Sequence, residues 1–343
     1  GDYFDCKLVS YASEYGVSPE RFSGEKHRVE YEDVNDYIIR DPNKCVLCGL
    51  CVRVCESVVG AGALGFTERG FDATVAPALG RPLSETSCVS CGNCVAMCPT
   101  GALQERTALC KPVPLQTEKT ITACSRCNAG CEVCVETHGK LLVRATPVAG
   151  GLLCKLGRFG FDKPAEPLSG EAYGAAVGQI ASRLKAPGAV IAVSPQLTNE
   201  DASAVKALAE RCGAKLIVSA AEKDEALSSE LVSRLAERAG VTEIEPYANL
   251  RGLESLGITQ KTAEGVKTLV IFGAVPAAPP SGVTFTAHCA PDPIAQADAA
   301  IPCSPYSDGT FTGFDGRTLT VRAAVASPLP GYAELASAIS AAL

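Results

Sequence analysis

The sequence predicts two structural parts of different kinds: small α+β units rich in cysteine at the front of the chain, and an α/β domain with a parallel sheet at the back. Fourteen of the 18 cysteines lie between Cys45 and Cys154, and only Cys212, Cys289 and Cys303 follow. Behind residue 165 the chain alternates strand-like and helix-like patterns, which is typical of α/β folds. The 343 residues are enough for two or three domains.

The back of the chain shows the alternation most clearly. Three short apolar runs have the pattern of buried strands: residues 188–194, 215–219 and 268–272. Thr198 or Asn199 can cap a helix that ends at Gly213, and a second helix is predicted over 224–239. Because strand–helix–strand order implies parallel pairing, we expect residues 166–343 to form a doubly wound, Rossmann-like domain. No G-x-G-x-x-G follows a strand, so nothing indicates a dinucleotide site.

The bulk properties exclude several functions. A net charge of −7 argues against nucleic acid, which needs a basic surface. No apolar run approaches the roughly 18–20 residues that span a bilayer, and no signal peptide is visible. We therefore expect a cytoplasmic protein with no direct membrane span. In such a compartment, closely spaced Cys-x-x-Cys pairs favour metal ligation over the alternative, a disulfide framework.

Two cysteine runs with the same spacing carry the strongest signal. Each reads C-x2-C-x2-C-x3-C: Cys45, Cys48, Cys51 and Cys55, then Cys88, Cys91, Cys94 and Cys98 before Pro99. In the bacterial ferredoxin run of this kind, the fourth cysteine binds the other cluster. We therefore predict one [4Fe–4S] cluster on Cys45, Cys48, Cys51 and Cys98, and a second on Cys88, Cys91, Cys94 and Cys55. Gly49 and Gly92 would let the backbone approach the sulfides. Zinc, the alternative, usually binds two separated cysteine pairs.

A third group of cysteines follows in residues 116–165. Cys124, Cys127 and Cys131 are spaced C-x2-C-x3-C, and Cys154 follows after 22 residues. Four thiolates fit one more [4Fe–4S] cluster. Cys134 leaves two alternatives open, because it could replace Cys131 or complete a compact zinc site with the first three.

The residues around Cys131 and Cys154 resemble the N-terminal cluster domain of the molybdopterin oxidoreductases. That superfamily includes formate dehydrogenases and the large iron–sulfur subunit of NADH dehydrogenase (complex I), and the likeness lies in Gly130-Cys131 and residues 153–162. The resemblance places the last ligand at Cys154 and favours Cys131 over Cys134. Residues 41–55 and 65–71 resemble the ferredoxin domain that NADH-linked formate dehydrogenases, complex I and iron-only hydrogenases share. Two later segments resemble part of the molybdopterin domain: residues 297–302 and 308–317.

Two departures from this family shape the functional prediction. The catalytic relatives have a lysine between cluster and pterin where this chain has Leu156, with Lys155 one place early. Residues 166–343 are also far fewer than the several hundred that enclose a pterin in the family. We therefore expect a degenerate scaffold domain, three [4Fe–4S] clusters and no molybdopterin.

The resemblance implies an electron-transfer subunit, itself non-catalytic, of a multisubunit flavin-linked NAD(P)H or ferredoxin oxidoreductase, with electron bifurcation as one version. Its expected partners are an NAD(P)H-oxidising flavoprotein and other redox subunits, with soluble ferredoxin as a further candidate. The alternative is a catalytic molybdenum or tungsten subunit of the formate dehydrogenase kind with part of its chain missing.

The N-terminal residues complete the predicted organisation. Cys6 and the residues after it resemble the last ligand of a cluster that precedes the ferredoxin domain in the family. Cys6 is thus a candidate ligand, and the alternative is a free thiol. The predicted units are an N-terminal arm left from a preceding cluster domain, a 2[4Fe–4S] ferredoxin-type domain, a third [4Fe–4S] domain and the α/β scaffold: residues 1–40, 41–115, 116–165 and 166–343.

Overall fold

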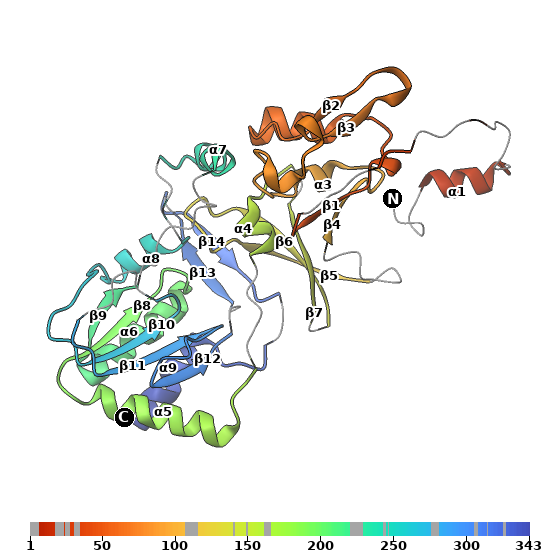
Figure 1. Cartoon of the computed structure of the whole chain (residues 1–343). Helices are drawn as coiled ribbons and strands as arrows, with labels where there is room; N and C mark the ends of the chain where they lie inside the picture. Colours follow the sequence, from red (N-terminus) through yellow and green to blue (C-terminus); the bar gives the residue numbers. More distant parts are fainter. Residues whose placement is uncertain are drawn as a thin grey trace.

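The computed structural model describes most of the chain and shows a cysteine-rich part beside an α/β part (Figure 1). The described residues are 7–17, 24, 28–30, 35–106, 116–139, 141–148, 150–160, 166–219, 229–242, 245, 247–275, 281–304, 308–313, 315–324 and 327–343. Cys6 and Cys110 lie outside them. None of the described helices combines the length and apolar character needed to cross a membrane.

Residues 35–106 form a unit of very short elements. Its strands form two antiparallel pairs: β1 (Ile38–Arg40) with β4 (Leu103–Glu105), and β2 (Gly65–Thr67) with β3 (Thr74–Ala76). Its helices are α2 (Leu50–Arg53), the π-helical turn η3 (Val54–Val59), α3 (Asn93–Met97) and the 3-10 turns η2 (Pro42–Lys44), η4 (Gly70–Asp72), η5 (Ala78–Gly80) and η6 (Leu83–Glu85). The helix α1 (Lys7–Glu14) buries none of its residues and lies apart in Figure 1.

A small antiparallel sheet and one helix follow. The sheet has the order β5 (Glu118–Ala123), β6 (Glu132–His138), β7 (Leu141–Pro147). Helix α4 (Lys155–Phe159) begins directly after Cys154 and packs beside β7. The inward side chains Val133, Val135 and Leu153 are almost fully buried and form this unit's core.

The back of the chain contains the predicted parallel sheet. Its strand order is β12 (Ala299–Pro302), β11 (Phe285–Ala290), β10 (Thr268–Phe272), β8 (Ala189–Val193), β9 (Lys215–Val218), and every neighbouring pair is parallel. In chain order this is the 2-1-3-4-5 arrangement of flavodoxin-like sheets. The three predicted strands and the parallel pairing are confirmed.

The first of the two helices predicted for the back is also confirmed. Helix α6 (Asn199–Cys212) begins after Thr198, whose hydroxyl accepts a hydrogen bond from the amide of Asp201, and it ends at Gly213 with a φ of 70°. The second predicted helix is observed as α7 (Glu230–Ala239), with Ser229 at its N-cap. Residues 224–228 of the predicted span lie outside the described residues.

The doubly wound expectation needs revision, because the described helices that pack on the sheet share one face. They are α5 (Gly170–Leu184), α6, α8 (Leu250–Ser255) and α9 (Tyr332–Ala342), and they form one large core with the side chains of that face. The opposite face buries Val190, Leu269 and Ile271 against the non-helical residues Val266 and Val283. Helix α7 does not share this core.

A hairpin joins the α/β part to the small antiparallel sheet. It consists of β13 (Gly309–Thr312) and β14 (Thr318–Val321), and β14 lies beside β5. Phe311 of the hairpin is buried against Ala123 and Ala248, which come from the two parts it connects.

Candidate iron–sulfur centres

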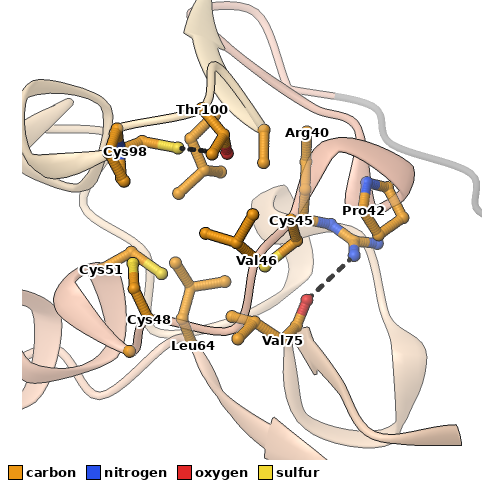
Figure 2. Close-up of a pocket in the computed structure, with 14 residues that line it drawn as sticks. Arg40, Pro42, Cys45, Val46, Cys48, Cys51, Leu64, Val75, Cys98 and Thr100 are labelled. Carbon is orange, nitrogen blue, oxygen red and sulfur yellow. Dashed lines mark hydrogen bonds between the residues drawn. The ribbon is translucent and has the colours of Figure 1, made fainter. Parts of the chain in front are cut away.

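The structure gathers four of the predicted ligands around one cavity. Cys45 and Cys48 come from the loop before α2, Cys51 lies in α2, and Cys98 follows α3 (Figure 2). The cavity, open solvent included, measures about 450 Å³ and its wall is mostly apolar. Three of these cysteines thus belong to the first run and the fourth to the second.

The other four cysteines of the two runs surround a second cavity. Cys88, Cys91 and Cys94 come from the loop before α3 and from α3 itself, and Cys55 comes from η3. Its empty volume is about 340 Å³, and aliphatic side chains such as Ile38 and Leu83 complete the wall. Each run of cysteines therefore contributes its fourth member to the cavity that the other run surrounds, as the ferredoxin spacing predicts.

The two runs adopt the same backbone conformation. Leu47 and Ser90 occupy equivalent positions with left-handed φ values of 56° and 50°, and Gly49 and Gly92 follow with 70° and 71°. The first two are unfavourable for residues with a side chain, so the repeated conformation indicates a constraint that both loops share. In each loop the strained residue's amide donates to the first cysteine's sulfur, over 3.4 Å for Leu47 to Cys45 and for Ser90 to Cys88. Donors aimed at sulfur are a device that tunes iron–sulfur clusters.

Electrostatics make bare thiolates costly in these cavities. Burial, followed by the nearby Cys45, raises the pKa of Cys51 to about 11. Burial raises the pKa of Cys94 well above its usual value, and the other cysteines of its set add to the effect. A thiolate is the form that ligates metal, so an iron core would supply the missing positive charge. Four soft sulfur donors in an apolar wall fit such a group.

Cys98 differs from its neighbours. Burial raises its pKa, but hydrogen bonds from the backbone of Leu103, Thr100 and Ala102 outweigh burial, so the net pKa lies below the usual value. The Thr100 hydroxyl also lies 3.9 Å from the Cys98 sulfur. The protein therefore stabilises the Cys98 thiolate through donors of the segment that leads into β4.

The third predicted set also comes together. Cys124 follows β5, Cys127 and Cys131 precede β6, and Cys154 is the N-cap of α4. The pKa of Cys131 is raised to about 12 by burial and by Cys127 and Cys154. Burial and the same neighbouring thiols raise the pKa of Cys124 as well.

Cys134 occupies a different side of β6. Successive strand residues point to opposite faces, and Val133 and Val135 on either side of it face the core that includes Cys124 and Cys131. Cys134 pairs with Ile121 and Thr146 on the other face of the sheet. This arrangement favours Cys131 over Cys134.

A polar junction that sequence reasoning missed connects the second and third sets. The side-chain nitrogen of Asn93 donates to the backbone carbonyl of Leu153 over 3.0 Å, and the side-chain oxygen of Asn93 accepts from the backbone N–H of Leu153 over 3.4 Å. Arg158 donates to Glu105 over 2.7 Å, and both side chains are almost fully buried. A Cβ at Gly92 would lie 2.6 Å from Arg158 Cδ, so glycine is needed for this close approach. Glu105 and Arg158 are 53 positions apart in the sequence, and Asn93 and Leu153 are 60 apart, so no local sequence pattern indicates these contacts.

A mixed polar and apolar cavity lies on the far side of the third set. Cys124, Arg126, Leu156, Thr198 and Arg322 are among its lining residues. Leu156 faces this cavity at the position where the catalytic family carries lysine. The neighbouring Lys155 instead places its Nζ 4.8 Å from the ring centroid of Tyr37.

The remaining described cysteines lie apart from these sets. Cys289 and Cys303 are buried in the core of the parallel sheet, and Cys212 is partly buried beside it. Within the described part of the chain, no three His, Cys, Asp or Glu side chains converge closely enough to hold a single metal ion. The candidate ligand Cys6 lies outside the described residues.

Comparisons with known proteins agree on the front of the chain. The family model for the ferredoxin-like domain of NADH-quinone oxidoreductase subunit 3 matches residues 35–104. An NADH-quinone oxidoreductase subunit of Rhizobium meliloti is 37% identical over 46% of this chain and 19% of its own length. NADP-reducing hydrogenase subunit HndD of Solidesulfovibrio fructosivorans is 34% identical over 46% of this chain and 27% of its own.

A third relative extends the match further along this chain. The NADPH-Fe(3+) oxidoreductase subunit alpha of Geobacter sulfurreducens is 32% identical over 57% of this chain and 25% of its own length. The chain thus spans about a quarter or less of the curated relatives it matches. Residues 35–104 thus match the ferredoxin-like domain of NADH-quinone oxidoreductase subunit 3, and the predicted resemblance to the large iron–sulfur subunits of complex I and related hydrogenases is confirmed.

Proposed function

We propose that this chain is an electron-transfer subunit of a multisubunit NAD(P)H-linked oxidoreductase and carries three [4Fe–4S] clusters. The observation that carries the proposal is the pair of cavities, each lined by three cysteines of one run and the fourth cysteine of the other. The relatives named as subunits of NADH-, NADP- and NADPH-linked enzymes support the same function.

Each cluster would supply a one-electron carrier, and the protein's own residues would set its potential. The first cluster is proposed on Cys45, Cys48, Cys51 and Cys98, the second on Cys88, Cys91, Cys94 and Cys55, and the third on Cys124, Cys127, Cys131 and Cys154. Exposed Cys48 suits electron exchange with a partner at the first cluster. The Asn93–Leu153 contact supports an order in which the second lies between the first and the third.

Metal analysis of the purified chain tests this proposal. We expect about twelve iron atoms per chain, with EPR signals of reduced [4Fe–4S] clusters after dithionite treatment. A stoichiometric amount of molybdenum or tungsten with extractable pterin would overturn the proposal. The proposed partners, a flavoprotein that oxidises NAD(P)H and a soluble ferredoxin, are tested by affinity purification of the native complex.

A pair of substitutions tests the third ligand set. Cys131→Ser should lose the third cluster and lower the iron content to about eight atoms. Cys134→Ser should keep the full iron content of about twelve atoms, because Cys134 lies on the other face of the sheet at β6. Iron loss in Cys134→Ser with retention in Cys131→Ser would reverse the assignment.

A further inference from the structure

The chain connection between β9 and β10 contains two described helices, α7 and α8, and of these only α8 packs on the sheet. In a doubly wound fold, the helix of such a crossover covers a face of the sheet. Helix α7 instead packs its apolar side chains into a buried cluster with residues of the cysteine-rich part. The members of this cluster are Leu231, Val232 and Leu235 of α7 with Val59, Cys91, Cys127 and Cys154.

Helix α7 is fastened to η3, the turn that carries Cys55 of the second set. Arg234 Nη1 donates to the carbonyl oxygens of Ser57 over 3.0 Å and Val58 over 3.2 Å, at the C-terminal end of η3. A cation is favourable there because it satisfies the last carbonyls and the helix dipole. A Cβ at Gly60 would lie 2.8 Å from Glu230 Cγ, so the two elements are in close contact.

The described residues 245, 247 and 248, which follow α7 in the chain, contact the loop of the third set. The amides of Tyr247 and Ala248 donate to the carbonyls of Arg126 and Ser125 over 3.0 and 3.3 Å. Glu245 exchanges hydrogen bonds with Asn128, donating to its side chain over 3.1 Å and accepting from its amide over 3.2 Å. One connection of the α/β part therefore contacts both cysteine sets.

We infer that helix α7 and the described residues that follow it, 245, 247 and 248, hold down the reduction potentials of the second and third clusters by keeping water away from them. The inference rests on the proposed function and gives the α/β part a role in electron transfer that needs no cofactor of its own. A reduced cluster carries one more negative charge than the oxidised one, and a dry apolar cover disfavours the more highly charged state.

The first set provides the contrast that makes this inference testable. None of the residues lining its cavity belongs to α7, and its Cys48 is exposed. Loosening α7 should therefore admit water near the second and third clusters and leave the first unchanged.

The test is an EPR-monitored redox titration of the full chain carrying Leu235→Ala. Single replacements in each set, Cys48→Ser, Cys94→Ser and Cys127→Ser, assign the signals to the clusters. We expect the midpoints of the second and third clusters to rise and that of the first to stay. Leu208→Ala is the matched control, because Leu208 is also a buried leucine but lies on α6 against the sheet.

Two outcomes would overturn the inference. One is an unchanged set of midpoints in Leu235→Ala, and the other is a similar shift of all three clusters or the same shift in Leu208→Ala. If Leu235→Ala lowers the yield of folded protein, the smaller change Val232→Ala should give the same selective pattern. Absence of iron in the unmodified chain would instead overturn the proposed function.

Discussion

The front of this molecule, residues 35–106, and its α/β back differ in the length of their elements and in the place of their buried cysteines. In residues 35–106 the buried cysteines, such as Cys51 and Cys94, line the two cavities, and the helices and strands are only three to six residues long. The back has helices of up to 15 residues and one large apolar core, in which Cys289 and Cys303 lie away from every proposed ligand. A small unit of short elements buries little apolar surface and usually needs a metal or another cross-link. We therefore predict that the front depends on its proposed clusters for folding and that the back does not.

Removal of iron should give the largest difference between the two parts. Anaerobic treatment with ferricyanide and a chelator is expected to unfold residues 35–106, since cluster binding supplies folding free energy there. Residues 166–219 and 247–275 should stay folded because their core contains none of the proposed ligands. Hydrogen exchange measured by mass spectrometry reports both parts at once. Equal loss of protection in the two parts would contradict the comparison.

The exchange of cysteines between the two runs can be tested next. Cys98→Ser should remove the first cluster and Cys55→Ser the second, each leaving about eight iron atoms of about twelve. Ligation within each run would reverse these assignments, and EPR spectra distinguish the two results. Cys212→Ser is the control and should keep its full iron content, since Cys212 lies beside the sheet core.

Local spacing explains why the cysteine sets could be predicted from the sequence. Fixed intervals between ligands, as in Cys45 to Cys55, encode one loop conformation, and the structure repeats it with nearly equal φ values in the second run. The strands at 189–193 and 268–272 were also predictable from local sequence, because a short, almost wholly apolar run is typical of a strand that is buried on both sides.

The position of α7 could not be predicted in this way. Its apolar stripe of Leu231 and Leu235 looks the same whether it covers a sheet or a cluster-binding unit, so periodicity gives the helix but not its partner. The pairing of Glu105 with Arg158 also has no local signal, because tertiary packing alone brings the two together.

That buried pair allows a third, smaller test of the comparison. Glu105→Gln leaves Arg158 without its counter-charge in a buried position, and loss of one partner of such a pair costs about 3–5 kcal/mol. The control in the back is Glu254→Gln, whose pair with Arg251 is exposed and contributes at most about 1 kcal/mol. Thermal loss of visible cluster absorption reports on the front. A loss in Glu105→Gln no larger than in the control would show that the junction is not needed for stability.

The smallest expected effect is a pH dependence confined to the back. His288 is buried at the carboxyl end of the sheet, where its Nε2 lies 2.7 Å from the carbonyl of Gly273 and its Nδ1 accepts from the amide of Ile294 over 2.9 Å. Burial lowers the pKa of His288, although the Gly273 carbonyl and Asp292 act in the opposite direction. The folded state therefore prefers the neutral imidazole.

A histidine with a lowered pKa in the folded state stabilises the fold above its unfolded pKa of about 6.5 and loses that contribution as the pH falls. Urea unfolding of the back, followed by far-UV circular dichroism, should show His288→Gln less stable than the unmodified chain at pH 8. This difference in stability should narrow at pH 5.5. At that pH the unfolded imidazole gains a proton that the folded state disfavours, so the unmodified chain loses stability and the glutamine variant does not. If the difference in the free energy of unfolding is the same at both pH values, the imidazole contributes through its hydrogen bonds alone. In that case the titration of His288 does not make the stability of the back depend on pH.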